Sequence, residues 1–428
     1  MTVNNRGTKR RMESKEAEAR VKAARTSEAA QIHPFFTKMK ERISLAWGER
    51  DGLMLAAHMN PAGNAKIAAF DLDGTLIKPK QGRRHPKDSS DWEWWNPVVP
   101  LRLRSLHEEG YKVVIFTNQG GLKHQKRKSD FKEKMNHVVA ELNIPLQIFV
   151  ATMYDSNRKP RTGMWSSFLS EHNSGIEVEL EKSFYIGDAA GRAKGWKKGA
   201  PEDHACVDRK FADNIGISFS TPEEYFLDEP MAAFSWGDFD PRVEMEELSS
   251  AALSPSALFS EEVKQEMIIF VGYPASGKTY FAKKRLVSQG YVHINQDTLG
   301  TRQRCTVACK AALQEGKSVV IDNTNPTAEA RRAYIQLAKQ HNIPTRCFWF
   351  TASEALAKHN NQFRSEVQKA NPVPEIAFRM YASKFEEPKM AEGFGEIIRV
   401  NFAFDREEEE EEKVGRASNW TKWRKWYL

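Results

Sequence analysis

Two series of short apolar segments, separated by amphipathic stretches, dominate the hydrophobic pattern of this chain. In the first series, apolar runs at 66–71, 111–117, 146–152 and 183–187 predict buried strands, and 98–109 predicts a helix between two of them. Strands that alternate with helices in this way lie parallel in one sheet, and the helices cover its faces. The first half of the chain is therefore predicted to be an α/β domain.

A second β-α series follows a polar stretch that is rich in Pro, Ser and acidic residues, a composition typical of a linker. Its apolar runs cover 267–272, 291–295, 318–322 and 346–351. We therefore expect an α/β fold with two domains, each a parallel sheet covered by helices. The expected boundaries are a disordered basic tail at 1–42, a first domain at 43–228, a linker at 229–264 and a second domain at 265–428.

The length of 428 residues suits two domains that each bury a core. No apolar run approaches the ~20 residues that span a bilayer, and the polar first residues lack the apolar stretch of a secretion signal. The four cysteines are too few and too scattered for a disulfide framework, so free thiols are expected. The composition therefore argues against membrane and secreted classes.

The formal net charge of +7 is concentrated in the first 42 residues, which hold 11 Lys and Arg against 5 Asp and Glu. Few large apolar residues occur there, which is typical of disorder. The run Lys9-Arg10-Arg11 is either a nuclear-import signal, a non-specific arm for nucleic acid, or a solvated extension. The peptide at 31–37 is either a partner-binding motif or the first part of the packed domain.

The first candidate site begins with the peptide Asp71-Leu-Asp73-Gly74-Thr, directly after an apolar strand. Ligands of open parallel sheets bind at the carboxyl ends of the strands. Residues two apart in an extended segment point the same way, so Asp71 and Asp73 can face one site. Gly74 allows the chain to turn sharply at this point.

Two neighbouring carboxylates can divide the work of phosphate transfer. One attacks phosphorus to form an aspartyl-phosphate, and the other protonates the leaving oxygen and then activates water. Because carboxylates and phosphate repel each other, a cation is needed, and Mg²⁺ suits such a site. The other strand ends supply the hydroxyl of Thr117, the charge of Lys159 and the carboxylate of Asp188. The pattern predicts a phosphatase.

This motif order resembles that of the haloacid dehalogenase superfamily, in the ordered set of Asp71, Asp73, Thr117, Lys159 and Asp188. The resemblance implies that Asp71 is the nucleophile and that Asp73 is the acid and base. It also implies Mg²⁺ held by Asp71, Asp188 and the backbone carbonyl of Asp73. Asp208 is a further acidic candidate near that metal.

The second candidate site is the segment GYPASGKT, which matches G-x-x-x-x-G-K-[ST] between a predicted strand and a predicted helix. Backbone N–H groups of such a loop curl around phosphates at the positive end of the helix. Lys278 would reach the β- and γ-phosphates of ATP, and Thr279 would contact Mg²⁺. The residues of this loop are Gly272, Tyr273, Pro274, Ala275, Ser276, Gly277, Lys278 and Thr279.

A P-loop transfers phosphate to a hydroxyl only where a base lies at the acceptor. Asp297 follows the predicted strand at 291–295, and Asp322 ends the strand at 318–322. Either aspartate is a candidate for the base or for a metal-binding helper, and periodicity does not decide between them. Arg364, on a predicted helix, is either a surface residue or the arginine that stabilises charge on the transferring phosphoryl group.

Longer phrases between 43 and 404 resemble the polynucleotide kinase/phosphatase family of animal and fungal DNA-end repair, and the phosphatase-then-kinase order matches it. The phrases are FDLDGT, GYKVVIFTNQ, RKPRTGMW, FYIGDAAGR, GYVHINQDTLGTRQRC, VVIDNTNP, HNNQFR and AEGF. The resemblance implies removal of 3′-phosphates and transfer of the γ-phosphate of ATP to 5′-hydroxyls of DNA. It favours Asp297 as the kinase base and Arg364 as the transition-state arginine. We therefore expect a nuclear monomer that acts on DNA ends. Its tail is expected to contact repair proteins.

Two departures from the family pattern stand out. The animal enzymes carry a forkhead-associated domain before the phosphatase, whereas only about 42 unpatterned residues precede it here. Gln362 stands where the animal pattern has an arginine. Three alternatives stay open: RNA end repair, a small-molecule phosphatase fused to a small-molecule kinase, and a scaffold without catalysis. The intact Asp71, Asp73, Lys278 and Thr279 argue against the scaffold.

Nucleic acid as a substrate has some support apart from the resemblance, because basic and aromatic side chains cluster near the predicted phosphatase mouth. Each cluster also has an ordinary reading, as a solvated start of a helix or as a tryptophan-packed cap. The residues concerned are Lys123, Lys126, Arg127, Lys128, Trp92, Trp94 and Trp95.

Overall fold

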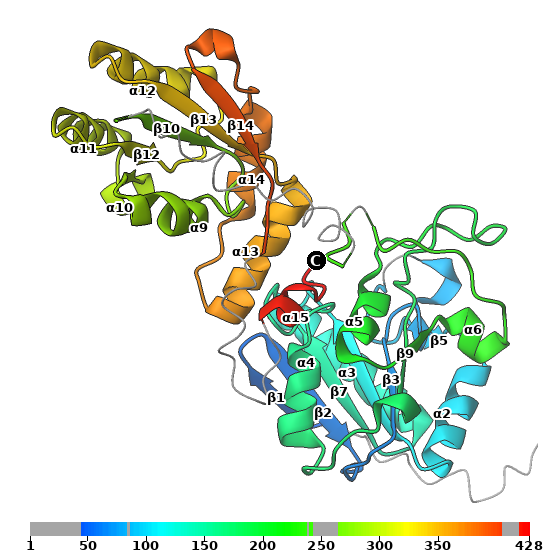
Figure 1. Cartoon of the computed structure of the whole chain (residues 1–428). Helices are drawn as coiled ribbons and strands as arrows, with labels where there is room; N and C mark the ends of the chain where they lie inside the picture. The colour runs from blue at the N-terminus through cyan, green and yellow to red at the C-terminus, as the bar shows by residue number, and fades with distance from the viewer. Residues whose placement is uncertain (1–43, 84–85, 238, 243–263, 405–418) are drawn as a thin grey trace, which may run out of the picture.

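The computed structural model describes residues 44–83, 86–237, 239–242, 264–404 and 419–428. These residues form two lobes, one from each half of the chain, with helices α13 and α15 between them (Figure 1). The expectations for the tail, including Lys9-Arg10-Arg11 and the peptide at 31–37, lie outside the described residues. No helix in the described ranges has both the length and the apolar character to cross a bilayer.

The first lobe is built on a seven-stranded sheet in the order β1-β2-β7-β6-β3-β8-β9. The five strands from β7 to β9 pair in parallel. Four of them, β7, β6, β3 and β8, were predicted, and β9 is an additional edge strand. Strands β1 and β2 were not predicted and run antiparallel at one edge, where Asp51 and Gly52 turn the hairpin with positive φ angles. The strands are β1 Trp47–Arg50, β2 Leu53–His58, β3 Ile67–Phe70, β6 Lys112–Asn118, β7 Leu146–Ala151, β8 Phe184–Ile186 and β9 Ser218–Ser220.

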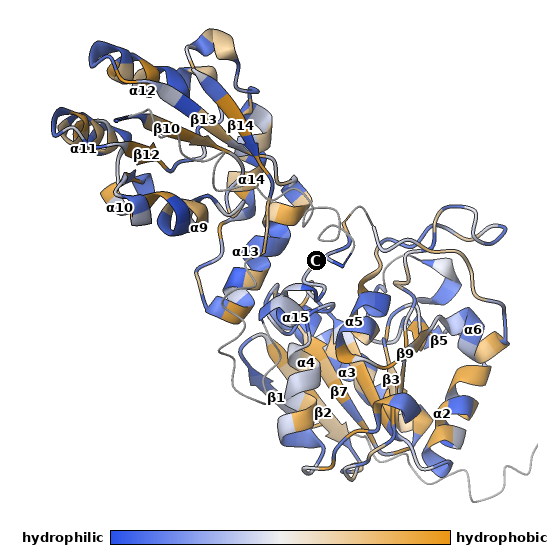
Figure 2. Ribbon diagram, viewed as in Figure 1, coloured by the Kyte–Doolittle hydropathy of each residue, from blue (hydrophilic) through white to orange (hydrophobic). Residues whose placement is uncertain are grey.

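Helices cover both faces of this sheet and bury an apolar core on each. Helices α2, α3 and α6 pack on one face, and α4 and α5 pack on the other. The strands are the apolar interior of the lobe in Figure 2, and the helices present polar residues outward. The helices are α2 Val98–Glu108, α3 Gln125–Leu142, α4 Gly163–Ser167, α5 Val207–Ile215 and α6 Pro222–Leu227.

A small hairpin of β4 (Ile77–Lys78) and β5 (Glu93–Trp94) follows the first candidate site. Trp92, Trp94 and Trp95 are partly buried there and pack against the core of the lobe. The indole N–H of Trp94 donates to Glu141 at 2.6 Å. The structure thus favours the reading of these tryptophans as packing residues of a cap.

The second lobe contains a five-stranded sheet in the order β11-β12-β10-β13-β14, and all four strand pairs are parallel. The predicted parallel sheet is confirmed, and β14 is an additional edge strand that was not predicted. Apolar cores fill both faces. The strands are β10 Met267–Val271, β11 Val292–Ile294, β12 Val319–Ile321, β13 Thr345–Phe350 and β14 Glu396–Val400.

The helices of the second lobe follow its strands along the chain, as the β-α pattern predicts. Helix α9 begins at the end of the P-loop, and α13 lies toward the first lobe (Figure 1). The helices are α9 Lys278–Phe281, α10 Gln296–Leu299, α11 Arg302–Gln314, α12 Ala328–Gln340, α13 Glu354–Gln368, α14 Glu375–Lys384 and α15 Asn419–Trp423.

Short turns of 3-10 or π type complete the fold and connect several of the longer elements. They cover Lys80–Gly82, Phe168–His172, Leu180–Lys182, Ala282–Leu286, Val287–Gln289 and Met390–Glu392.

Candidate active sites

The first candidate site lies where β3, β6 and β8 end. Asp71 follows β3, and its backbone N–H donates to the carbonyl of Ile186 in β8 at 2.8 Å. The side chain of Asp71 points to Lys159, whose Nζ lies 2.5 Å from Asp71 Oδ1 and 2.7 Å from Asp208 Oδ1. All three side chains are buried. The structure therefore brings the predicted nucleophile and lysine into one ion-paired cluster.

Tyr185, from β8, closes the same cluster. Lys159 Nζ donates to the Tyr185 hydroxyl at 2.7 Å, and that hydroxyl lies 3.2 Å from Asp208 Oδ1. Burial alone would lower the pKa of Lys159, but the carboxylates of Asp208 and Asp71 outweigh it and raise the pKa. Lys159 is therefore held in its charged form. Sequence reasoning read Tyr185 only as part of a strand, because a buried tyrosine there is equally typical of a core.

Three carboxylates of this site are grouped as a divalent cation would require. Oxygens of Asp71, Asp188 and Asp208 all lie within 4.8 Å of one another. Burial and the charges of Asp71 and Asp208 raise the pKa of Asp188. A Cβ on Gly74, which has φ = 82°, would lie 2.4 Å from Asp188 Oδ2, so only glycine leaves room there. These hard oxygen ligands fit Mg²⁺, and Asp208 belongs with them.

Asp73 faces a different environment from Asp71. Its side chain is 46% exposed and contacts Gln119 Nε2 at 2.5 Å and Lys134 Nζ at 3.3 Å. Gln119 Nε2 also donates to the hydroxyl of buried Thr117 at 3.0 Å. Gln119 and Lys134 were not singled out from the sequence, although Gln119 directly follows Thr117-Asn118. Asp73 thus lies at the open side of the site, oriented by two donors.

The loop that carries Lys159 is fixed to the end of β6. Asn118 Nδ2 donates to the Lys159 carbonyl at 3.1 Å, and the Lys159 N–H donates to Asn118 Oδ1 at 3.0 Å. This paired contact holds the lysine backbone beside the strand that ends in Thr117 and Asn118. It explains how a residue 88 positions after Asp71 reaches it.

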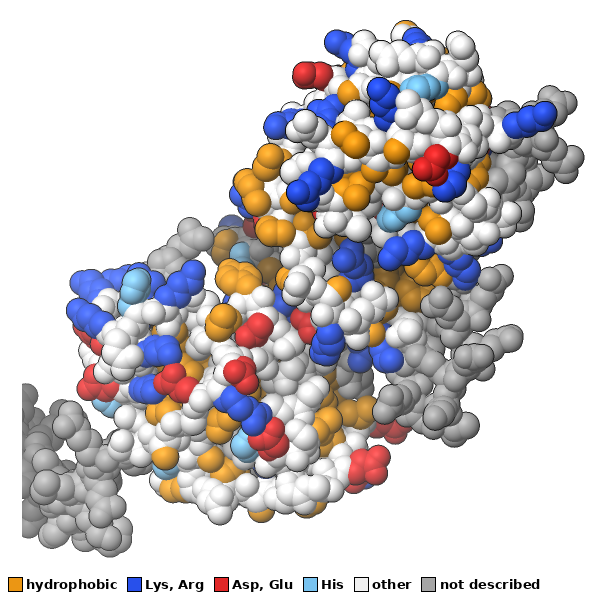
Figure 3. Space-filling view, turned by 90° about the vertical axis from the view of Figure 1, so that its left-hand side faces the viewer, with side chains coloured by type: hydrophobic (Ala, Val, Ile, Leu, Met, Phe, Trp, Pro, Cys, Tyr) orange, Lys and Arg blue, Asp and Glu red, His pale blue; other side chains and the backbone are white. Residues whose placement is uncertain are grey.

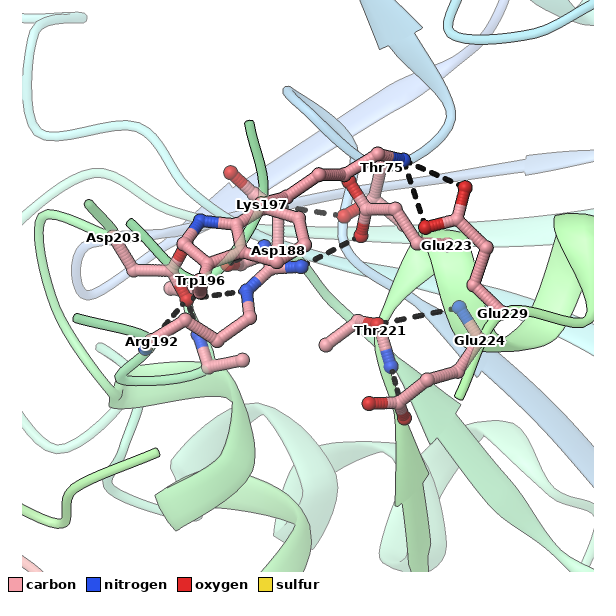
Figure 4. Close-up of polar contacts among 12 residues, drawn as sticks. Thr75, Asp188, Arg192, Trp196, Lys197, Asp203, Thr221, Glu223, Glu224 and Glu229 are labelled. Atoms are coloured by element: carbon pink, nitrogen blue, oxygen red, sulfur yellow. Dashed lines mark hydrogen bonds and ion pairs between the residues drawn. The ribbon is translucent and has the colours of Figure 1, made fainter. Parts of the chain in front are cut away.

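Arg192 is held by two carboxylates and by the backbone carbonyl of Asp188 (Figure 4). Its guanidinium donates to Asp203 at 2.9 Å, to Glu223 at 2.7 Å and to the Asp188 carbonyl at 3.2 Å. The Trp196 ring lies 3.9 Å from the guanidinium carbon. These contacts fix the backbone of Asp188. They could not be predicted, because the partners of Arg192 come from separate segments of the chain.

The second candidate site is the P-loop between β10 and α9. A Cβ on Gly272 would lie 2.8 Å from the Phe350 Cβ, and Gly277 has φ = 91°. Lys278 is buried and donates to the carbonyls of Gly272, at 3.0 Å, and Tyr273. Burial lowers the pKa of Lys278 to about 8. This lysine therefore contacts neutral oxygens of its own loop.

Asp322 lies beside the P-loop threonine. Its Oδ2 accepts from Thr279 Oγ1 at 2.7 Å, from Asn295 Nδ2 at 3.0 Å, and lies 2.9 Å from His293 Nε2. Although burial opposes the charge, the contacts with His293 and Thr279 keep the pKa of Asp322 below its usual value. Asp322 is thus fixed as a carboxylate at the place expected for a metal-binding helper.

Asp297 and Arg364 reach the same site from two helices. Asp297 is exposed at the start of α10, which Asn295 caps, and Arg364 is partly buried on α13. Both act electrostatically on Lys278, since Asp297 raises its pKa and Arg364 lowers it. The predicted kinase residues are therefore near enough to Lys278 to influence its charge. Asp297 is exposed, whereas Asp322 is buried. Gln362 is also partly buried on α13.

The fold and the two sites define a two-lobed protein with an aspartate-based phosphatase site and a P-loop kinase site. The family model for polynucleotide kinase 3 phosphatase matches residues 66–226, and an AAA domain model matches residues 267–388. Across most of its length the chain belongs to the bifunctional polynucleotide phosphatase/kinase family. The predicted family is therefore confirmed.

Three relatives illustrate this membership. The bifunctional polynucleotide phosphatase/kinase of Schizosaccharomyces pombe is 40% identical over 375 residues, covering 87% of this chain and 89% of the relative. A protein of Acanthamoeba polyphaga mimivirus is 34% identical over 382 residues, covering 82% of this chain and 88% of its own length. The polynucleotide 3′-phosphatase of Arabidopsis thaliana is 39% identical over 177 residues, covering 38% of this chain and 24% of that protein.

Proposed function

We propose that this chain heals broken DNA strands by removing 3′-phosphates and by phosphorylating 5′-hydroxyls with ATP. The observation that carries the proposal is that one chain of this family holds two separate phosphate sites of opposite chemistry. One is built around the buried pair of Asp71 and Lys159, and the other is the P-loop with Lys278. The first would remove phosphate from one end, and the second would add it to the other.

In the proposed phosphatase reaction, a carboxylate oxygen of Asp71 attacks the phosphorus of the 3′-phosphate. The bond from phosphorus to O3′ breaks, an aspartyl-phosphate forms, and Asp73 gives its proton to the leaving O3′. Water then attacks the phosphorus while Asp73 takes its proton. The bond to Asp71 breaks and inorganic phosphate leaves. Thr117 and Lys159 hold the phosphate oxygens through both steps.

A divalent cation fits this site through the grouped carboxylates of Asp71, Asp188 and Asp208. The backbone carbonyl of Asp73 is the further ligand that the family resemblance implies. Mg²⁺, when bound, would reduce the repulsion between the carboxylates and the incoming phosphate. Asp208 has a second role in this proposal, because it keeps Lys159 charged and aimed at Asp71. Tyr185 supports the same orientation from β8.

In the proposed kinase reaction, Asp297 takes the proton of the 5′-hydroxyl and O5′ attacks the γ-phosphorus of ATP. The bond between the γ-phosphorus and its bridging oxygen breaks, and ADP leaves. Lys278 exchanges its loop carbonyls for phosphate oxygens, and Arg364 stabilises the charge that develops on the transferring group. Thr279, with Asp322 beside it, would hold the Mg²⁺ that accompanies ATP.

Exposed basic side chains near the first site suit a polynucleotide. Lys123 is exposed just before α3, and Lys126 and Arg127 are exposed in its first turn. Lys128, in the same turn, is partly buried and pairs with Glu49. Figure 3 shows Lys and Arg side chains gathered at one edge of the lower lobe and along the junction of the lobes. Such a surface can follow a phosphate backbone without reading its sequence.

The experiment that tests this function compares matched substrates with the purified full chain. DNA oligonucleotides with a 3′-phosphate and a 5′-hydroxyl should be converted at both ends in the presence of Mg²⁺ and ATP. RNA oligonucleotides with the same ends and free nucleotides serve as the competing substrates. A clear preference for RNA would replace DNA in the proposal, and turnover of free nucleotides alone would replace both.

We further propose that the chain acts in the nucleus as a monomer and that its basic tail contacts repair proteins. Homology to polynucleotide-processing proteins and the run Lys9-Arg10-Arg11 support the location. Replacing these three residues by alanine should shift a fluorescently tagged chain out of the nucleus. Sedimentation equilibrium should give a mass near 48.9 kDa. An unchanged nuclear signal would contradict the role of these three residues in import, and a dimer mass would contradict the monomer.

A further inference from the structure

Residues Asn419–Leu428, here named the strap, pack between the two lobes (Figure 1). The strap contains α15, and its side chains Trp423, Trp426 and Tyr427 are buried. It contacts α13 of the second lobe through His359 and Asn360, and α5 of the first lobe. A segment with this many buried aromatic side chains is a built part of the structure, and it lies at the junction of both lobes.

On the side of the second lobe, the strap reaches the P-loop through one intervening residue. The indole N–H of Trp423 donates to Asn360 Oδ1 at 2.7 Å, and Asn360 Nδ2 donates to the Ala275 carbonyl at 3.3 Å. Phe402 stacks on Trp423 and also lies against Gly277 of the P-loop. Asn360 and Trp423 are both buried, so this connection is shielded from water.

His359 adds a second contact between α13 and the strap. Its Nε2 lies 2.7 Å from the Trp423 carbonyl, and its ring packs edge-on against Trp423 and Tyr427. Burial lowers the pKa of His359 to about 4, so the ring is neutral at physiological pH. His359 and the adjacent Asn360 therefore both bind Trp423 from the same turn of α13.

On the side of the first lobe, the strap reaches the loop of Lys159 through Asn214 of α5. Asn214 Oδ1 accepts from the Trp426 N–H at 2.8 Å. Asn214 Nδ2 donates to the Trp426 carbonyl at 2.7 Å and to the Pro160 carbonyl at 2.8 Å. Pro160 directly follows Lys159, whose Nζ contacts Asp71. One side chain thus links the strap to the backbone of the proposed phosphate-binding lysine.

Arg161 supplies a parallel link to the same loop. Its Nε donates to the Tyr427 carbonyl at 3.3 Å, and its Nη1 donates to the Asp155 carbonyl at 2.5 Å. Arg161 also pairs with Glu366 of α13 at 3.6 Å. The loop that carries Lys159 therefore contacts the strap and the second lobe at once.

The position of Trp426 itself is strongly fixed. Its ring stacks on Trp236 at 5.0 Å, and its indole N–H donates to Asp213 Oδ2 at 2.7 Å. The guanidinium of Arg242 lies 4.7 Å from the same ring, and Lys210 Nζ lies 4.7 Å from it. Because the Trp426 side chain is fixed by these contacts, its backbone groups stay in place to hydrogen-bond with Asn214.

We propose that the strap is a shared positioning element for both active sites. It fixes the backbone position of the P-loop through Trp423 and Asn360, and it fixes the backbone position of the Lys159 loop through Trp426 and Asn214. None of these residues contacts the reacting atoms, so each is a positioning residue. The inference rests on the proposed function, because it concerns the two activities assigned above.

The test on the kinase side is Trp423→Phe in the full chain, which keeps an aromatic ring but removes the N–H that Asn360 accepts. We expect kcat/KM for ATP in 5′-phosphorylation to fall about tenfold, chiefly through KM, because Asn360 loses its buried partner. The 3′-phosphatase rate should stay within about twofold. Trp349→Phe is the matched control, since Trp349 packs in the same lobe, on β13.

The test on the phosphatase side is Asn214→Ala, which removes the link from the strap to Pro160. We expect kcat/KM for 3′-dephosphorylation to fall about tenfold while 5′-phosphorylation stays within about twofold. The matched control is Asn64→Ala, because Asn64 also bonds to backbone groups of the first lobe, Gly110 and Lys66. That control should leave both activities unchanged.

A double-variant cycle separates positioning from general packing. Asn360→Asp keeps the acceptor for Trp423 but removes the donor to Ala275. If both substitutions act on the P-loop through the contact of Asn360 with Ala275, their effects should not add. The double variant should then raise KM for ATP no further than the more severe single variant. Fully additive effects would contradict the route through Asn360.

The outcomes distinguish the inference from the proposed function. If the wild-type chain has neither activity, the proposed function fails. If the wild type has both activities and Trp423→Phe and Asn214→Ala leave them unchanged, the strap inference fails alone. It also fails if each variant lowers both activities equally together with the melting temperature, because the strap would then only hold the lobes together.

Discussion

The two lysines that we propose bind phosphate have opposite surroundings in the two lobes. Lys159 is sealed between Asp71 and Asp208, and these carboxylates raise its pKa. Lys278 contacts neutral oxygens of its own loop, and burial lowers its pKa to about 8. The first site thus pairs its lysine with carboxylates before any substrate arrives. The second site needs the anionic ATP to supply the partner for its lysine.

This difference follows from the chemistry that we propose for each site. The nucleophile of the first site is a side chain of the protein itself. Because this carboxylate is buried, the protein must also supply a cation beside it. A P-loop binds a substrate that brings several negative charges, so a preformed ion pair would compete with that substrate. The lysine of the first lobe is therefore ion-paired with carboxylates, whereas the lysine of the second lobe is left without an ion pair until ATP binds.

The largest expected effect tests the pairing directly. Lys159→Met should abolish 3′-dephosphorylation and destabilise the first lobe by about 3–5 kcal/mol, because Asp71 and Asp208 lose their cation. Lys278→Met should abolish 5′-phosphorylation but destabilise the second lobe by only about 1–3 kcal/mol, since it breaks hydrogen bonds to neutral oxygens and no ion pair. Urea unfolding and both end-processing assays measure these effects. Equal destabilisation by the two variants would remove the contrast between the lobes.

The next effect concerns the open aspartate of the second site. Asp297→Asn should lower 5′-phosphorylation by about 10²–10⁴-fold, because the 5′-hydroxyl loses its base. The exposed position of Asp297 predicts an unchanged melting temperature. Asp322→Asn provides the comparison, since Asp322 accepts from Thr279 and contacts His293, and its loss should also reduce stability. Full kinase activity in Asp297→Asn would shift the role of base to Asp322.

Removal of divalent metal should stop both reactions but affect the stability of the lobes differently. Mg²⁺ alone should stabilise the first lobe, by about 2.7 kcal/mol at a concentration 100 times its dissociation constant, because Asp71, Asp188 and Asp208 repel one another without it. The second lobe should respond only when ATP is added with Mg²⁺. Thermal melting with EDTA, Mg²⁺ and Mg²⁺ plus ATP distinguishes these cases. Stabilisation of both lobes by Mg²⁺ alone would contradict the account.

The smallest expected effect is a pH dependence at the lobe junction. His359 has a pKa of about 4 in the folded chain, against 6.5 for an exposed histidine, because it is buried beside Trp423 with Lys210 nearby. Below pH 6.5 the unfolded chain binds a proton that the folded chain refuses, so stability falls as pH drops toward 4. Between pH 7 and pH 5.5 the loss is at most about 1.4 kcal/mol, which is smaller than the effect expected for Mg²⁺.

His359→Gln supplies the control for this pH effect, since glutamine keeps a donor for the Trp423 carbonyl but does not titrate. The melting temperature should fall more between pH 7 and pH 5.5 in the wild type than in this variant. Glu354 and Lys358, which line the same cavity, titrate in both chains and cancel in the comparison. An identical fall in the two chains would rule out the contribution of His359.

Much of the fold could be predicted because apolar runs of parallel strands are unmistakable in this sequence. All four predicted strands of each lobe are present. The edge strands β1, β9 and β14 were missed because each is largely exposed or only partly buried. The internal strand β2 was missed together with its hairpin partner β1. The hairpin of β1 and β2 did have a signal in Asp51-Gly52. That turn was overlooked because it lies outside the β-α alternation.

The candidate sites were predictable where a motif lies on one strand end, as for Asp71, Asp73 and the P-loop. The partners that tune these residues were not, since Tyr185, Gln119 and Arg192 meet them only through tertiary packing. The strap illustrates the same limit. Its aromatic residues were visible in the sequence, but their contacts with Asn214 and Asn360 join segments far apart in the chain.

The most direct test of the central claim is a paired assay on one labelled DNA oligonucleotide with a 3′-phosphate and a 5′-hydroxyl. We expect Asp71→Ala to abolish 3′-dephosphorylation and spare 5′-phosphorylation, and Lys278→Ala to do the reverse. Retention of both activities in both variants would contradict the assignment of the two sites.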